Sequence, residues 1–423
     1  MTGTVSVEAP DQVQRRMVVV LSAAQVLGGV AVASGVAVNG VLAKRLSGST
    51  SLSGLAQTMS VIGAALLAVP LARLAGRLGR RPALTVGYAL ATVGAVISLT
   101  AGILGSFPLL LLGAALFGGG SASGLQARYA AVDAAVPARR ARSLSVVVWA
   151  TTVGSVAGPN LTGPGGWVAA RLGIPELAGP FVFSVVAFTL SAGVVWGLLR
   201  PDPLAAGLRH AVQERHAGVL AALRVVGGHR GAVLGLVTVG ISHAVMVGVM
   251  VMTPVHLQDH GATLRIIGLV ISVHIAGMYA ASPLFGWFAD RAGRVAGVFV
   301  GAGLLALSLV IAATADPMDH TRLGIALTVL GLGWSACLVS GSTLLTESVP
   351  AVHRTAVQGL SDLAMGTVAA LAGLAAGPVL DHGGYPQLTA SAGLLLVPVL
   401  LLAGWAAGVD GERPRRDREP ARG

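Results

Sequence analysis

The chain has few of the residues that a soluble protein needs at its surface. Only 11% of its 423 residues are charged, against about 25% in an ordinary soluble domain. A single cysteine, Cys337, excludes an intramolecular disulfide. The single lysine, Lys44, follows an alanine, so the Gly-Lys of an ATP-binding P-loop is absent. These scarcities exclude a soluble enzyme, a disordered chain and a secreted disulfide scaffold.

What the chain has in abundance is apolar sequence. Hydrophobic residues make up 54% of it, and its mean hydropathy is +0.79. A membrane-spanning helix needs ~20 apolar residues, and continuous apolar runs favour helices over barrel strands. The first run is longer than the core of a signal peptide, so we expect an uncleaved helix there. Twelve spans are predicted, at 17–40, 52–75, 83–105, 108–133, 143–168, 177–199, 231–256, 266–289, 295–315, 321–347, 355–380 and 385–409.

The arginines predict the orientation of these spans. With the N-terminus in the cytoplasm, 22 of the 28 basic residues fall on the inner side and five on the outer side, with Arg128 inside a span. This asymmetry follows the positive-inside rule. We therefore expect both termini to be cytoplasmic in a multi-pass protein of the plasma membrane. The net charge of +11 is explained in this way, and we expect the lipid bilayer rather than nucleic acid as the macromolecular partner.

The longest polar stretch lies midway along the chain and divides the spans into two sets of six. The predicted organisation is a cytoplasmic N-terminus (1–16), a six-helix bundle (17–200), a cytoplasmic linker (201–230), a second bundle (231–409) and a cytoplasmic tail (410–423). One amphipathic helix is expected within the linker, over 217–226. The predicted fold class is an all-α polytopic membrane protein.

The two halves also match at a fixed offset of 214 residues, which indicates an internal repeat. The matched pairs are Arg77 with Arg291, Gly79 with Gly293, Arg80 with Arg294, Asp133 with Glu347, Arg140 with Arg354, and Gly163-Pro164 with Gly377-Pro378. Parallel six-helix repeats are one plan of secondary transporters, whose substrate site lies between the halves.

Two short loops carry the best-defined motif. The loop after the eighth span contains Gly286, Asp290, Arg291, Gly293 and Arg294 in the spacing G-x-x-x-D-R-x-G-R. This resembles the loop signature of the major facilitator superfamily, whose charges help to hold the cytoplasmic gate. The loop after the second span repeats the pattern with Arg77, Gly79, Arg80 and Arg81, but has Ala72 in place of the glycine and Gly76 in place of the acid.

The fifth span carries a second motif, Gly154, Gly158, Pro159 and Gly163. Small residues four apart allow close helix packing, and a proline can kink a helix. The segment resembles the antiporter motif G-x-x-x-G-P-x-x-G-G, with Thr162 in place of one glycine. In the family this motif is typical of proton-coupled exporters, where it shapes helix bending and prevents leak.

A few ionisable residues lie within or at the ends of spans. Asp133 and Glu347 are either interfacial charges or partners of loop arginines that lock the inner gate. Arg128 either extends to the inner interface or acts within the membrane. Asp362 lies ~12 Å along its helix from Arg354 and can carry a proton; the alternative is a salt bridge to an arginine such as Arg77.

Histidines are the remaining candidates for proton transfer or metal binding. His243 lies mid-span and can titrate near neutral pH, or simply pack, and the same choice holds for His274. His256 and His260 have zinc-ligand spacing, but no third ligand is evident, so we expect neither a metal nor a cofactor. The proton-coupling candidates are Asp362, His243 and Arg128.

If the family architecture holds, the first, fourth, seventh and tenth spans line the substrate cavity. Their polar or adaptable side chains suit an amphipathic ligand. The cavity candidates are Gln25, Asn39, Gln126, Met246, Met250, Trp334 and Ser340.

The resemblance implies a monomeric 12-helix major facilitator that works by alternating access, with a small-molecule substrate and protons as its partners. The expected function is proton-coupled efflux of small amphipathic molecules, as in drug:proton antiporters. The alternatives are a uniporter or proton symporter for a metabolite, or a membrane receptor without transport. No metal cluster or nucleophile–base arrangement favours a membrane enzyme.

Overall fold

The computed structural model describes residues 10–133, 140–203 and 219–411, and within these ranges every regular element is a helix. Residues 1–9 of the predicted N-terminus, 134–139, half of the linker (204–218) and most of the predicted tail (412–423) lie outside the described residues. The elements, with η for short 3-10 helices, are α1 (Pro10–Ser47), α2 (Leu55–Leu78), α3 (Arg80–Leu104), α4 (Phe107–Asp133), α5 (Arg140–Ala157), η2 (Gly158–Leu161), α6 (Thr162–Leu172), η3 (Glu176–Ala178), α7 (Gly179–Leu198), α8 (Val219–Gly227), α9 (Arg230–Asp259), α10 (Leu264–Ala280), α11 (Ser282–Ala292), α12 (Arg294–Ala313), α13 (His320–Glu347), η4 (Ala351–His353), α14 (Arg354–Leu394) and α15 (Val397–Gly411).

All twelve predicted spans are present. In the described ranges, ten segments are long and apolar enough to cross a membrane. The fifth span, which is not among them, consists of α5 and α6 with η2 between them. The last of the ten, Ala356–Ala407, holds two spans, since the backbone turns at Gly384 with φ +68° and ψ −173°. The predicted fold class, twelve helices in two sets of six, is therefore confirmed.

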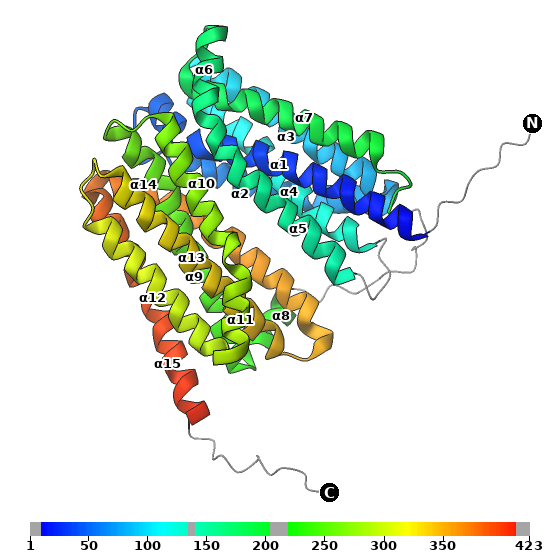
Figure 1. The fold of residues 1–423 in the computed structure, drawn as a ribbon, viewed down its shortest axis with the longest axis vertical. Helices are drawn as coiled ribbons and strands as arrows, with labels where there is room; N and C mark the ends of the chain where they lie inside the picture. Colours follow the sequence, from blue (N-terminus) through cyan, green and yellow to red (C-terminus); the bar gives the residue numbers. More distant parts are fainter. Residues whose placement is uncertain (1–9, 134–139, 204–218, 412–423) are drawn as a thin grey trace, which may run out of the picture.

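The helices form two bundles, which Figure 1 shows as a blue-to-green body (α1–α7) and a green-to-red body (α9–α15). Helix α8 precedes the second bundle and packs on it, because Ala222 and Val226 share a buried apolar cluster with Leu345 and Val357. The amphipathic helix predicted in the linker is thus confirmed over its described residues.

Glycines allow the helices of the first bundle to approach closely. A Cβ added at Gly154 in α5 would overlap the carbonyl oxygen of Val26 in α1, and one added at Gly63 in α2 would overlap that of Ala115 in α4. Membrane helices gain little from burying apolar surface against one another, so contact of this kind supplies much of their packing energy.

A buried amide joins four helices of the same bundle. The side-chain nitrogen of Gln25 in α1 donates to the Gly124 carbonyl in α4 (3.2 Å) and to the Thr151 hydroxyl in α5 (3.0 Å). The hydroxyl of Tyr88 in α3 donates to its oxygen at 3.3 Å. Gln25 is only 2% exposed, so this predicted cavity residue lies inside the packed bundle and fixes the position of α1.

The close approach of α1 and α5 can be tested by adding one methyl group. We expect Gly154→Ala to destabilise the protein by about 1–3 kcal/mol through overpacking, measured as an earlier thermal transition of the detergent-purified protein. Gly193→Ala in α7 is the matched control, since nothing lies within 4 Å of a Cβ there. Equal transitions for the two variants would contradict this account of the packing.

Candidate functional site

The two bundles are joined by polar contacts at one end of the molecule, which we call the closed end. It holds the last residues of α1 and α9 and the kink in α14. The Lys44 ammonium pairs with the Asp259 carboxylate at 2.5 Å, and the Ser51 hydroxyl donates to the Asp381 carboxylate at 2.6 Å. Deeper in the membrane, the Thr58 hydroxyl donates to the Ala370 carbonyl at 3.1 Å. Each contact joins a residue of the first bundle to one of the second.

The motif of the fifth span contributes to the same contact. Pro159 lies in η2, which interrupts the helix, and its carbonyl oxygen is so close to Gly268 of α10 that a Cβ there would overlap it. The Thr162 hydroxyl lies 2.7 Å from the carbonyl oxygens of both Pro159 and Leu264, so it can donate to either bundle. Thr162, the residue that departs from the family motif, therefore supplies a polar contact between the halves.

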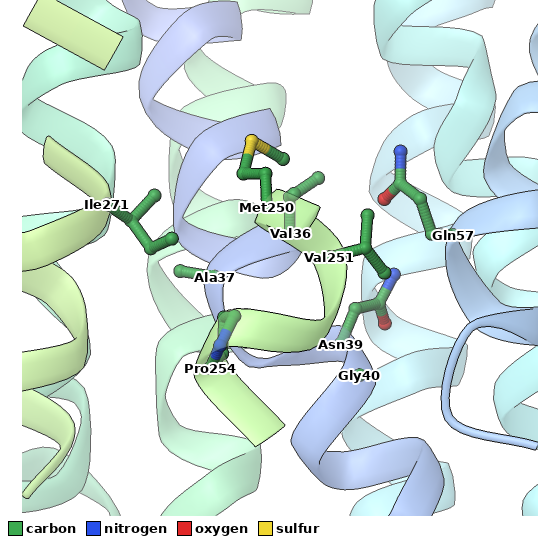
Figure 2. A pocket seen from close by; sticks show the side chains of 9 residues that line it. All are labelled: Val36, Ala37, Asn39, Gly40, Gln57, Met250, Val251, Pro254 and Ile271. Carbon is green, nitrogen blue, oxygen red and sulfur yellow. The ribbon is translucent and has the colours of Figure 1, made fainter. Parts of the chain in front are cut away.

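A small cavity lies between the halves beneath the closed end (Figure 2). Its volume is about 10 Å³, which is the size of one water molecule. Asn39 of α1, Gln57 of α2 and Met250 of α9 line it. The amide oxygens of Asn39 and Gln57 have no hydrogen-bond partner among the described residues. Asn39 and Met250, two predicted cavity residues, thus meet at the contact between the halves.

Away from the closed end, Arg128 of the first bundle lies within electrostatic range of two ionisable residues of the second. The guanidinium of Arg128 in α4 interacts electrostatically with the Asp362 carboxyl of α14 and with Tyr279 of α10. Neither Arg128 nor Asp362 has a hydrogen-bond or ion-pair partner in the described part of the chain. Asp362 is exposed, and no salt bridge to Arg77 forms. The two charges therefore belong to different bundles and form no direct contact.

His243 of α9 belongs to an aromatic cluster of the second bundle. Its Nδ1 accepts a hydrogen bond of 3.0 Å from the indole N–H of Trp334 in α13. Trp334 also meets the ring of Tyr279 edge-on, with centroids 5.9 Å apart and an interplanar angle of 80°. The predicted residues His243 and Trp334 are therefore brought together, beside Tyr279, which no motif in the sequence indicates.

The other histidines lie elsewhere. His274 is fully buried, and its Nδ1 lies 2.6 Å from the Leu327 carbonyl, so it packs within the second bundle. His256 and His260 lie at the closed end, where the His256 ring stacks on Tyr385 at 4.4 Å. In the ranges that the structure describes, no group of three or more potential metal ligands comes together.

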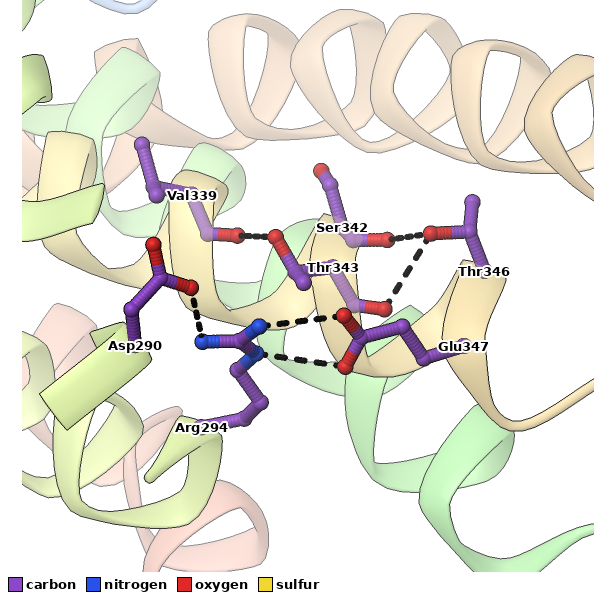
Figure 3. A network of polar contacts seen from close by, with 7 residues as sticks. All are labelled: Asp290, Arg294, Val339, Ser342, Thr343, Thr346 and Glu347. Atoms are coloured by element: carbon purple, nitrogen blue, oxygen red, sulfur yellow. Dashed lines mark hydrogen bonds and ion pairs between the residues drawn. The ribbon is translucent and has the colours of Figure 1, made fainter. Parts of the chain in front are cut away.

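The second copy of the loop motif forms an ion-pair network at the arginine-rich end, the end opposite the closed end (Figure 3). Arg294 at the start of α12 donates to Asp290 of α11 at 2.5 Å and, through two nitrogens, to both oxygens of Glu347 at 3.0 and 3.2 Å. Glu347 therefore pairs with a loop arginine, which is one of the two alternatives for this acid. The side chains of Asp133 and Arg140 lie outside the described residues.

At the first copy of the motif, the carboxylate comes from another segment of the chain. The carboxylate of Asp202, which follows α7, accepts hydrogen bonds from the backbone N–H groups of Arg80 (3.1 Å) and Arg81 (2.8 Å) at the start of α3. The Arg80 guanidinium donates to the Gln126 oxygen at 2.5 Å. Asp202 thus supplies a carboxylate at Gly79 of the first loop, which has no acid of its own because Gly76 occupies that position of the motif. An acid directly after the sixth span was the available signal.

The remaining predicted residues pack or lie at the surface. Arg81 stacks on Trp196 at 4.2 Å and Arg291 on Trp287 at 5.7 Å. Met246 is buried, and Ser340 is fully buried where α12 and α13 meet at Gly297. Gln126 is 9% exposed and accepts a hydrogen bond from Arg80, so its side chain holds the first loop and does not line an open cavity.

Two six-helix repeats, a closed end and unpaired charges between the bundles define the class of secondary transporters built for alternating access. The sequence matches the Major Facilitator Superfamily over residues 19–266 and again over 235–423. The chain belongs to this family.

Relatives and solved structures agree with that assignment. The chain is 36% identical over 95% of its length to the uncharacterized MFS-type transporter YdeG of Bacillus subtilis, covering 94% of it. It is 28% identical over 92% of its length to the riboflavin transporter RfnT of Brucella anthropi, covering 96% of it. The fold resembles the crystal structure of the nucleoside transporter NupG, with a TM-score of 0.66 at 15% identity and coverage of 95% and 100%.

The role of Asp202 can be tested by removing its carboxylate. A negative charge at a helix N-terminus that accepts backbone N–H bonds contributes about 0.5–2 kcal/mol. We expect Asp202→Ala to lower thermal stability by this amount and Asp202→Asn, which keeps one acceptor, to lower it less. Adding Gly76→Asp, at a position with open space around it, should recover part of the loss. No change on Asp202→Ala would contradict this role.

The closed end can be tested by reversing a charge. Cys337 is buried, so a Cys337→Ser, Met250→Cys protein reports access to the small cavity through maleimide labelling. Lys44→Glu should raise the labelling rate up to about 5-fold, because a partly exposed ion pair contributes at most about 1 kcal/mol. Adding Asp259→Lys should restore the slow rate. Unchanged labelling in Lys44→Glu would show that the pair does not hold the halves together.

Proposed function

We propose that this chain is a proton-coupled secondary transporter that exports small amphipathic organic molecules by alternating access. The observation that carries the proposal is the exposed carboxyl group of Asp362, which has no partner among the described residues. It lies on α14 within the field of Arg128 of the other bundle, while the two bundles are joined at the closed end. We infer that a titratable group so placed exchanges protons with the arginine-rich side as long as the closed end holds.

Alternating access follows from this arrangement. While the closed end is held by Lys44–Asp259 and Ser51–Asp381, a proton on Asp362 can leave only toward the arginine-rich end. The carboxylate that remains lies within the field of Arg128, whose positive charge offsets its own. Rocking of the bundles about the site would then bring Asp362 into contact with the opposite side.

The direction of transport is proposed from the fifth span. Gly154, Pro159 and Thr162 make the tight contacts of α5, η2 and α6 with α1 and α10. The tight contacts fit the antiporter interpretation of the motif, since a proton-coupled transporter must keep protons from leaking between the bundles; the direction itself is proposed from the resemblance of the motif to that of proton-coupled exporters.

The sidedness of the protein is part of the proposal. With the arginine-rich end in the cytoplasm, as the positive-inside rule predicts, both termini are cytoplasmic and the structure is inward-facing. We further propose the plasma membrane as the location, a monomer as the working unit, and a transported small molecule and protons, rather than an enzymatic reaction, as its chemistry.

Proton symport or uniport of a metabolite is the second candidate function. The similarity to a riboflavin transporter over nearly the whole chain favours it. The two candidates differ in whether proton movement opposes substrate movement. A receptor without transport would bind ligand but show no flux in proteoliposomes.

The coupling role of Asp362 gives a direct test. In everted vesicles, substrate-induced proton release is followed by the fluorescence of an acid-quenched dye. We expect Asp362→Asn to abolish this signal, a loss of at least about 10-fold, while expression and thermal stability are kept, because the exposed carboxyl has no structural partner among the described residues.

Asp316→Asn is the matched control, since Asp316 lies in the exposed turn between α12 and α13. It should leave proton release unchanged. Full coupling in the Asp362→Asn protein would remove this residue from the mechanism. Proton uptake together with substrate, rather than release, would favour the symport candidate.

A further inference from the structure

In an aromatic cluster of the second bundle, the ring of Tyr279 is accessible to solvent. Trp334 is 3% exposed and holds the cluster together, since the ring centroids of His243 and Tyr279 each lie 5.9 Å from its own. Tyr279, by contrast, is 37% exposed. An edge-on contact uses one side of the tyrosine and leaves a ring face free, and such a face prefers an offset or edge-on partner.

The Tyr279 ring lies on the face of α10 that is turned to the first bundle. Gly268 and Ser272 of the same helix contact Pro159 and Val156 of that bundle. Ser272 and Tyr279 are seven residues apart, about two helical turns, so they share this face. Among the described residues the hydroxyl group of Tyr279 has no hydrogen-bond partner.

The hydrogen bond within the cluster decides which nitrogen of His243 carries a proton. An indole N–H is only a donor, so the nitrogen that receives it, Nδ1, must be the acceptor. In a neutral imidazole the proton is then on Nε2. That N–H has no partner among the described residues, and the His243 side chain is half-buried. Trp334 thus holds His243 as a hydrogen-bond donor.

We propose that His243, Trp334 and Tyr279 form a substrate subsite for a planar aromatic molecule that carries a hydrogen-bond acceptor. The substrate ring packs on Tyr279, its acceptor receives the Nε2–H of His243, and Trp334 positions both. The rings of His243 and Tyr279 are at most twice 5.9 Å apart, so one small molecule can span them. The inference rests on the proposed function, since it assumes that substrate enters the space between the bundles.

Ring aromaticity is the property to vary. The probes are naphthalene-2-carboxamide and its saturated counterpart, decahydronaphthalene-2-carboxamide, which share an uncharged amide acceptor. Binding to the detergent-purified full chain is measured by equilibrium dialysis against protein-free micelles. We expect the aromatic amide to bind roughly 2- to 10-fold more tightly, the range of an aromatic contact beyond area burial.

Variants assign this preference to residues. Tyr279→Leu should abolish the preference, and Tyr279→Phe should keep it. Phe299→Leu is the control, because Phe299 of α12 is an aromatic residue of similar exposure, 39%, outside the cluster. His243→Phe should weaken both amides by roughly 2- to 10-fold through the lost hydrogen bond. Trp334→Phe should act like His243→Phe, because it removes the donor that sets the His243 proton.

Three results would overturn the subsite: no binding of either amide to the wild-type chain, equal affinities for the two, or a preference that survives Tyr279→Leu. Because these measurements follow equilibrium binding, they do not depend on proton coupling. An aromatic preference that persists in Asp362→Asn, whatever that variant does to transport, supports the subsite. Absence of substrate-induced proton release in the wild-type chain, together with an intact aromatic preference, would therefore contradict the proposed function alone.

Discussion

Two helix bundles in a bilayer gain little hydrophobic energy by touching, because the lipid they displace is as apolar as their own side chains. The halves of this transporter are held by other means at the closed end. Glycines let the backbones meet, as Gly54 does at Gly373 and Gly268 does at Pro159. A few polar pairs, Lys44–Asp259 among them, add specificity. A contact built from small residues and weak pairs can separate and reform, which alternating access requires.

The distribution of charges follows from this arrangement. At the arginine-rich end, Arg294 is satisfied by two carboxylates (Figure 3) and the start of α3 by Asp202. These contacts lie within single bundles, so they can persist while the bundles move. Arg128 and Asp362, by contrast, belong to different bundles and interact electrostatically without a direct contact. Charges without a fixed partner are free to respond to a proton or a substrate.

Much of the fold could be predicted because its signals are local. Apolar runs of sufficient length gave the twelve spans, and the Gly-Pro pair in the fifth span indicated where that helix is interrupted, as η2 confirms. The site was less accessible to sequence reasoning. Gln25 and Gln126 were selected as polar residues on cavity-lining spans, but one joins four helices and the other holds Arg80. A polar residue within a span can be recognised from the sequence, but the sequence does not show whether its side chain points into the bundle or into a cavity.

The sequence by itself determined the number of spans, their repeat and the end at which the arginines gather, since each can be read from the order of residues along the chain without knowing which helices touch. Only the tertiary structure decided that Asp202 completes the first loop, that His243 meets Trp334 and that Arg128 faces Asp362. These pairs are separated by many residues and join different helices. Their meeting depends on how each helix is rotated and tilted, which is set by side-chain packing over the whole bundle.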